Sequence, residues 1–276
     1  YTLQDLAGKN LAVQSTTKPE GIFLKRTDER IPKLGNLISL GHRELIFTFL
    51  EKGYAEKDPT ADVEGHDACR KVCILASLAF GKHVYPNQVE TEGITNITLE
   101  DVSYIENAGG VIKLLGQIKY INDNEIAAFV SPAVVYNGSQ LASVKDVFNA
   151  ILVRGDAVGD VCFYGPGAGK LPTASAVVAD IIDCAKHSER KKIFGWGAGD
   201  EDYVVDYKER IEMPFYVRAK ATPAEINAKF SDVKFLSRKG QPSDEVAFIT
   251  DIMTENKLNK KLDGINVINT IKVTNY

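Results

Sequence analysis

Residues 111–136 read VIKLLGQIKYINDNEIAAFVSPAVVY, and this stretch does most to decide the fold. Apolar and β-branched residues form two strand-like runs, 111–121 and 126–136. The residues between them, Asn-Asp-Asn at 122–124, are types that favour turns. Because this connection is too short for a crossover helix, we predict an antiparallel hairpin.

A second hairpin is predicted further along the chain. Its two apolar runs are 150–154 and 161–164, with Gly155, Asp156 and Gly159 between them. Glycine and aspartate in so short a connection again favour a turn and antiparallel pairing. The two hairpins together indicate an antiparallel or mixed sheet.

Helical patterns flank these hairpins. Apolar residues recur at helical spacing before Gly81 ends the run, namely Ala68, Val72, Leu75, Ala76 and Ala79. Residues 98–107 form a second pattern, closed by Gly109 and Gly110, and 172–186 form a third that begins with proline. We therefore predict an α+β fold in which helices cover the sheet. Residues 1–50 give little pattern beyond an amphipathic piece at 44–52.

The last part of the chain has its own order of elements. From residue 214 to 276 it reads strand, helix, strand, strand, helix, strand. The predicted strands are 215–219, 233–237, 245–251 and 267–273, and the predicted helices are 223–230 and 255–262. This order is a split βαβ arrangement, as in ferredoxin-like folds. The stretch 188–213 before it has little periodicity and is predicted to be a linker, with room for a strand.

Composition narrows the classes of function. The chain has 276 residues, 44% of them hydrophobic, and a formal net charge of −4 without a basic stripe, which argues against a nucleic-acid partner. The four cysteines include no CxxC pair and the four histidines are scattered, so we expect reduced thiols and no metal site. No apolar run is long enough to cross a membrane, and we expect a cytoplasmic protein.

The densest polar cluster is EKDPTADVEGHDACRK at residues 56–71. Asp67 and Lys71 are four residues apart at the start of the apolar helix, so both side chains project from one face. If that face borders a pocket, the ammonium and neighbouring carboxylates, Glu56, Asp58 and Asp62, would hold a zwitterionic amino acid and move one proton. The alternative is an exposed Asp–Lys pair that stabilises the start of a helix.

A glycine-rich loop, GPGAGK at residues 165–170, precedes the third helix. Backbone N–H groups ahead of a helix can bind an anion. The loop fails the P-loop template, because Leu171 replaces the required Ser or Thr and Tyr164 occupies the position of the first glycine. It follows a hairpin, so it is not a dinucleotide-binding fingerprint either. A tight turn with close backbone packing and a contact with part of a cofactor both remain open.

Three stretches together resemble the catalytic domain of homoserine dehydrogenases. They are KGYAEKDPTADVEGHDACRK (52–71), LASVKDVFNAILVRGDAVGD (141–160) and FYGPGAGKLPTASAVVADIID (163–183), in this order and spacing. The resemblance is nearly continuous over 52–186. Residues 14–18, QSTTK, resemble the family's Asn-Gly-Thr-Thr-Asn substrate loop, and the last unit resembles an ACT domain. The first strand-to-helix loop of that unit, 219–224, lacks the usual glycine.

The resemblance implies NAD(P)-dependent interconversion of L-homoserine and L-aspartate 4-semialdehyde, in threonine and methionine biosynthesis. It makes Lys71 the proton donor and acceptor, with Asp67 beside it. The implied substrate contacts are Glu56, Asp62, Asp67 and Thr16, and the implied contacts on the nicotinamide side are Gly53, Gly165, Gly167 and Gly169. No metal ligand is implied among these residues.

The resemblance also predicts an organisation. We expect a catalytic and dimerisation domain over 1–190, with 1–50 divergent, a linker over 191–212, and an ACT-like regulatory domain over 213–276. A homodimer is expected by analogy, its sheet extended through 111–136. The family's nucleotide-binding half has no counterpart here, so the chain alone should show little or no turnover. The alternative is a non-catalytic paralogue that senses an amino acid through its ACT-like domain.

Overall fold

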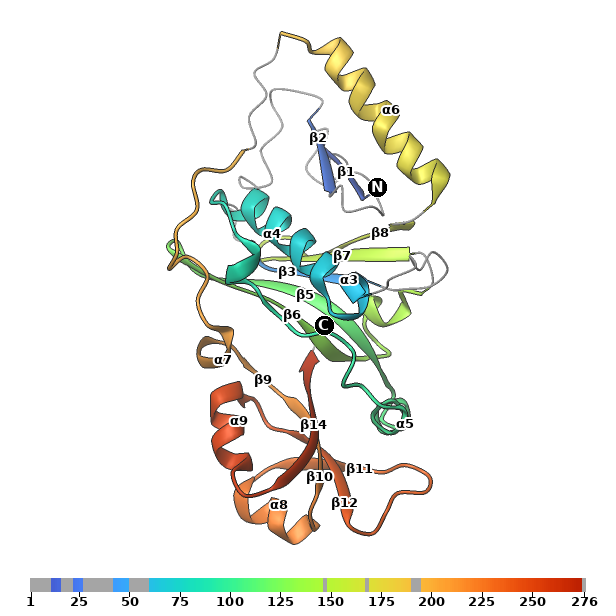
Figure 1. Cartoon of the computed structure of the whole chain (residues 1–276), viewed down its shortest axis with the longest axis vertical. Helices are drawn as coiled ribbons and strands as arrows, with labels where there is room; N and C mark the ends of the chain where they lie inside the picture. Colours follow the sequence, from blue (N-terminus) through green and yellow to red (C-terminus); the bar gives the residue numbers. More distant parts are fainter. Residues whose placement is uncertain are drawn as a thin grey trace.

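The computed structural model describes residues 11–15, 22–26, 42–49, 60–145, 148–166, 169–189 and 195–274. Most of its strands belong to one long sheet, to which helices attach on both faces (Figure 1). In spatial order these strands are β11 (Val233–Leu236), β12 (Glu245–Thr250), β10 (Phe215–Lys220), β14 (Asn266–Thr274), β6 (Glu125–Tyr136), β5 (Gly110–Asn122), β3 (His42–Phe49), β7 (Phe148–Gly155) and β8 (Gly159–Pro166), with β4 (Glu90–Thr91) pairing with β6.

Both predicted hairpins are confirmed. Strands β5 and β6 pair antiparallel from Gly110 opposite Tyr136 to Asn122 opposite Glu125. Strands β7 and β8 pair antiparallel along their whole length. Nearly every residue of β6 is buried, because both faces of this central strand are covered.

The amphipathic piece at 44–52 overlaps a strand. Strand β3 lies between β5 and β7 and is antiparallel to both, so it joins the two hairpins into one sheet. Two further strands, β1 (Leu11–Ser15) and β2 (Ile22–Arg26), pair only with each other and lie beside α6 (Lys170–Lys186), the predicted third helix (Figure 1).

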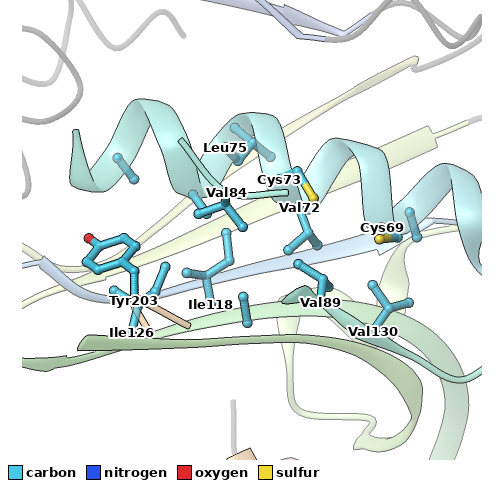
Figure 2. Close-up of a cluster of buried hydrophobic side chains, with 14 of the residues drawn as sticks. Cys69, Val72, Cys73, Leu75, Val84, Val89, Ile118, Ile126, Val130 and Tyr203 are labelled. Atoms are coloured by element: carbon cyan, nitrogen blue, oxygen red, sulfur yellow. The ribbon is translucent and has the colours of Figure 1, made fainter. Parts of the chain in front are cut away.

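The predicted first helix is α4 (His66–Phe80), which is confirmed. Gly65 precedes it with φ 78° and Gly81 ends it with φ 77°, both left-handed conformations that glycine adopts without strain. Its apolar face packs on the sheet, where Val72 points toward Val89 and Ile118 (Figure 2). This packing fixes which residues of α4 point away from the sheet.

The predicted second helix is α5 (Leu99–Asn107), and it is also confirmed. The Thr98 hydroxyl accepts a hydrogen bond from the Asp101 N–H, and the Asp101 carboxylate accepts one from the Thr98 N–H, which is a capping box. Gly109, with φ 79°, follows its end as predicted.

The last part of the chain has the predicted order β10, α8 (Pro223–Lys229), β11, β12, α9 (Glu255–Leu262), β14. The four strands are antiparallel and lie in the order β11-β12-β10-β14, which is the ferredoxin-like arrangement. Helices α8 and α9 cover one face of them, and α5 packs on the other. We call residues 215–274 the C-terminal unit.

The C-terminal unit continues the main sheet. Strand β14 pairs parallel with β6, with Lys272 opposite Ala133, so the edge of β6 is already occupied. The described part of the preceding segment packs back on the first part of the chain through bridges at Gly197 and Val204. It carries α7 (Tyr207–Arg210) and β9 (Glu212–Met213), which pairs with β13 (Met253–Thr254). Among the described helices, none has the length and hydropathy of a membrane span.

Candidate active site

The structure describes five of the residues assigned to the site from sequence. Asp62 lies in α3 (Thr60–Val63), Asp67 and Lys71 lie in the following helix α4, and Gly165 and Gly169 lie where β8 meets α6. The other assigned residues, Thr16, Gly53, Glu56 and Gly167, and also Asp58, fall outside the described residues. The described residues contain no group of three potential metal ligands.

Lys71, which is buried, forms an ion pair with the partly exposed Asp67. The Lys71 Nζ lies 2.7 Å from Oδ2 of Asp67, and their side chains are 9% and 23% exposed. The alternative from sequence was a solvent-exposed pair at a helix start, and this degree of burial does not fit it. Asp67 occupies the first turn of α4, where the helix dipole favours a negative charge. The pair therefore holds a charged ammonium beside a carboxylate in a site of low solvent access.

A tight turn joins the helix of Asp62 to the start of α4. The N–H of Gly65 donates to the carbonyl of Asp62 at 3.0 Å, and Gly65 then begins α4 by accepting from the Cys69 N–H at 2.9 Å. The left-handed Gly65 lets α3 and α4 follow one another without an intervening loop. Two carboxylates and one ammonium thus come from a stretch of ten residues, 62–71.

A neighbouring loop fixes this turn from outside. A Cβ placed on Gly93 would lie 2.3 Å from the carbonyl oxygen of Val63 and 2.6 Å from Cα of Glu64, so only glycine fits there. On its other side the turn is close to the Thr91 side chain, whose Cγ2 would lie 3.1 Å from a Cβ on Gly65. Sequence analysis missed Gly93. Its one signal was a glycine isolated in TEGIT at 91–95, a common sign of close backbone approach.

The cysteines of α4 lie on the opposite side of the helix from Lys71. Cys69 and Cys73 are each two residues from Lys71, a rotation of about 200° in an α-helix. Both are buried in the core under α4 and both are free thiols (Figure 2). Their mutual hydrogen bond lowers the pKa of Cys69 to about 6 and raises the pKa of Cys73 above its usual value, and burial adds to the rise. Of the four cysteines expected to be packed thiols, Cys69 and Cys73 are buried, Cys162 is partly buried and Cys184 is exposed.

The glycine loop has two different kinds of glycine. Gly165 pairs with Asn149 inside the β7–β8 hairpin, and a Cβ placed on it would meet no atom of the described residues within 4 Å. Close backbone packing therefore does not explain Gly165. Gly169, with φ 127°, immediately precedes α6, and few other residues adopt this conformation. The turn explanation fits Gly169, while Gly165 leaves open space beside the strand.

A surface groove lies elsewhere. It has a volume of about 980 Å³ and is lined by residues of the segments 85–90 and 199–207, among them Tyr85, Glu90 and Tyr207. None of the site residues assigned from sequence lines this groove. This groove is therefore not the pocket that was expected beside Lys71.

A comparison with protein families matches the part of the chain that contains these site residues. The sequence model of the family described as homoserine dehydrogenase matches residues 41–182, which include Asp62, Asp67, Lys71 and the glycine loop. The chain belongs to the homoserine dehydrogenase family. The family resemblance predicted from the three sequence stretches is thereby confirmed.

Individual members of the family agree with this result. The homoserine dehydrogenase of Corynebacterium glutamicum is 46% identical over 153 residues, covering 54% of this chain and 34% of that protein. That of Bacillus subtilis is 42% identical over 146 residues, covering 53% and 34%. The chain thus matches about a third of the length of these curated relatives.

Solved homoserine dehydrogenases share the fold over a longer range. The enzyme of Thiobacillus denitrificans superimposes with a TM-score of 0.70 at 28% identity, covering 88% of this chain and 66% of that one. A structure of the S. aureus enzyme gives 0.68 at 28% identity, covering 86% and 66%. The structural likeness therefore extends beyond the residues that the family model matches.

Proposed function

We propose that this chain is the substrate-binding part of a homoserine dehydrogenase, which interconverts L-homoserine and L-aspartate 4-semialdehyde. The observation that carries the proposal is the ion pair of the buried Lys71 with Asp67, 2.7 Å apart, inside the segment that matches the family. A lysine held at low solvent access next to a carboxylate is suited to binding an amino acid and moving a proton at its oxygen.

Each residue has a separate task in this proposal. The Lys71 ammonium donates a proton to the aldehyde oxygen during reduction, and its neutral amine accepts one from the hydroxyl during oxidation. Asp67 orients that lysine through the ion pair and contacts the substrate. In this proposal Glu56 binds the substrate amino group, Asp62 supports the pocket, and Thr16 is a further substrate contact. Holding the reacting atoms in position is the main contribution of such groups.

The cofactor is NAD(P), which supplies or takes up the hydride when it is bound. The glycine loop fits a cofactor on its open side, because Gly165 has space where a Cβ would stand. Gly53, Gly165, Gly167 and Gly169 line the nicotinamide side in this proposal. A nucleotide-binding half must be supplied for turnover, so the chain alone is expected to oxidise homoserine little or not at all with NAD(P).

The same proposal covers the organisation of the protein. Residues 1–190 form the catalytic part, 191–212 connect, and 213–276 form an ACT-like regulatory domain, supported by the ferredoxin-like order of its strands. The protein is a cytoplasmic homodimer that serves threonine and methionine biosynthesis. Since β5 and β6 both have neighbours on their two edges, a dimer uses other surfaces of the sheet than these edges.

Calorimetric titration with L-homoserine tests the proposal. The wild-type chain should bind homoserine, and Lys71→Ala and Asp67→Ala should each weaken binding at least about ten-fold, a loss of about 1.4 kcal/mol. Arg70→Ala is the matched control, because Arg70 is an exposed cation on the same helix and should not matter. Binding of threonine but not homoserine, unchanged by the Lys71 and Asp67 variants, would instead support an amino-acid sensor.

A further inference from the structure

The turn between α3 and α4 is hydrogen-bonded to the loop that faces it. The Ile94 N–H donates to the Val63 carbonyl at 2.9 Å, and the Thr95 hydroxyl donates to Oε1 of Glu64 at 2.6 Å. Together with the close approach of Gly93, these bonds make loop 92–95 and the turn one packed piece. A displacement of the loop must therefore displace the turn, because packed interiors do not deform continuously.

Glu92 holds the start of this loop to the rest of the protein at two points. Its N–H donates to the Val130 carbonyl of β6 at 2.8 Å. Its carboxylate lies 3.2 Å from Nζ of Lys272, which belongs to β14 in the C-terminal unit. The side chain of Lys272 is only 6% exposed, while that of Glu92 is 43% exposed. The C-terminal unit therefore contacts the loop through a buried ammonium.

Lys272 has further partners within and beside the C-terminal unit. Oε2 of Glu255, on α9, lies 3.4 Å from Nζ, and the ring of Tyr207 lies 5.3 Å from it. A buried ammonium between two carboxylates is costly to neutralise, because its removal leaves those charges without their common counter-ion. Lys272 thus connects α9 and β14 on one side with loop 92–95 on the other.

We propose that Lys272 is a positioning residue for the substrate site, acting through Glu92 and loop 92–95 on the turn that carries Asp62 and Asp67. The inference rests on the proposed function, in which homoserine binds at these carboxylates. It links the C-terminal unit to the substrate site. A shift of β14 or α9 changes the ion pair between Lys272 and Glu92 and thereby the affinity for the substrate. In such a coupling, the free energy of homoserine binding differs between two positions of the loop and the turn, which move together.

Two measurements on the full chain test this. Hydrogen exchange of the Ile94 amide reports the loop-to-turn hydrogen bond without any ligand, and homoserine titration reports the site. Lys272→Met and Glu92→Gln should each speed Ile94 exchange about ten-fold and weaken homoserine binding about three-fold to ten-fold. The double variant should be no worse than the more affected single variant, because both act on one contact. Lys272→Arg should retain wild-type behaviour.

Lys220→Met is the matched control, because Lys220 forms an exposed ion pair with Asp244 in the same unit, with side chains 57% and 66% exposed. It should leave both measurements unchanged. If Lys272→Met does not fold, Glu92→Gln tests the same contact from its exposed side. Unchanged Ile94 exchange in Glu92→Gln, or fully additive effects in the double variant, would overturn the inference. Absence of homoserine binding in the wild type would count against the proposed function, and the exchange result would still decide the coupling.

Discussion

The guanidinium of Arg218 lies 3.2 Å from the carboxylate of Asp101, and their side chains are 6% and 0% exposed. This pair joins β10 of the C-terminal unit to α5. Asp101 also accepts hydrogen bonds from the Tyr216 hydroxyl at 2.9 Å and from Nδ2 of Asn269 at 2.8 Å. Both carboxylate oxygens of Asp101 therefore have hydrogen-bond partners. Removing this buried charge would leave those partners without their acceptor.

Asp101→Ala should therefore lower the free energy of unfolding by about 3–5 kcal/mol, since it leaves the Arg218 charge buried without its nearest counter-ion. Urea unfolding measures this. Asp160→Ala is the control, because Asp160 pairs with Arg154 at a site where both side chains are 38% exposed, and it should cost no more than about 1 kcal/mol. Equal losses in the two variants would show that burial of the Asp101 network contributes nothing.

Gly93→Ala should destabilise the chain by about 1–3 kcal/mol and weaken homoserine binding, because the new Cβ would lie 2.3 Å from the carbonyl oxygen of Val63. The contact is with backbone, so no side-chain rotation relieves it. Thermal unfolding and calorimetry with homoserine measure the two effects. Gly138→Ala, where a Cβ meets nothing within 4 Å, should change neither. A stable Gly93→Ala variant with wild-type affinity would mean that the turn does not depend on this loop.

The two glycines of the β8–α6 junction should respond differently to alanine. Gly165→Ala should stay within about 0.5 kcal/mol of wild-type stability, because its Cβ meets no atom of the described residues. Gly169→Ala should cost about 1–3 kcal/mol, because φ is 127°. In an enzyme that carries a nucleotide-binding half, Gly165→Ala should raise KM for NAD(P). A large loss of stability in Gly165→Ala would show that close packing, and not space for a cofactor, requires glycine at this position.

Much of the fold follows from local sequence patterns. The hairpins were predictable because turn residues and strand runs are adjacent in the chain, and α4 because its apolar spacing lies between two glycines. Strand β3 was not, since the short mixed stretch HRELIFTF fits a helix or a strand and its partners lie far along the sequence. The joining of β14 to β6 was missed for the same reason: only the folded chain brings Lys272 opposite Ala133.

The candidate site was likewise predictable from sequence only in part. The spacing of Asp67 and Lys71 predicted that they share a helix face, but not that Lys71 is buried, because burial depends on elements elsewhere in the chain. Lys272 gave no signal, since one lysine in a predicted strand has no pattern that distinguishes it. Residues that support a site from a distant part of the sequence become visible only through contacts such as that between Lys272 and Glu92.

Stability should fall at alkaline pH partly because of Tyr104. Its side chain is fully buried, and its hydroxyl donates to Oε1 of Glu245 at 2.8 Å. Burial, reinforced by the Glu245 hydrogen bond and charge, raises the pKa of Tyr104 to about 12. An unfolded tyrosine has a pKa of about 10. The contribution is therefore fully present below about pH 10 and is lost as pH rises toward 12, at about 1 kcal/mol per pH unit.

Tyr104→Phe removes this titration together with one hydrogen bond. At pH 8 the variant should be less stable than the wild type by about 1 kcal/mol, the usual contribution of such a bond. Between pH 10 and 12 the wild type loses the contribution of Tyr104 while the variant does not, so the difference should shrink and then change sign. Urea unfolding of both proteins at pH 8 and pH 11 measures it. A difference that stays constant over this range would mean that the Tyr104 hydroxyl ionises as readily in the folded chain as in the unfolded one.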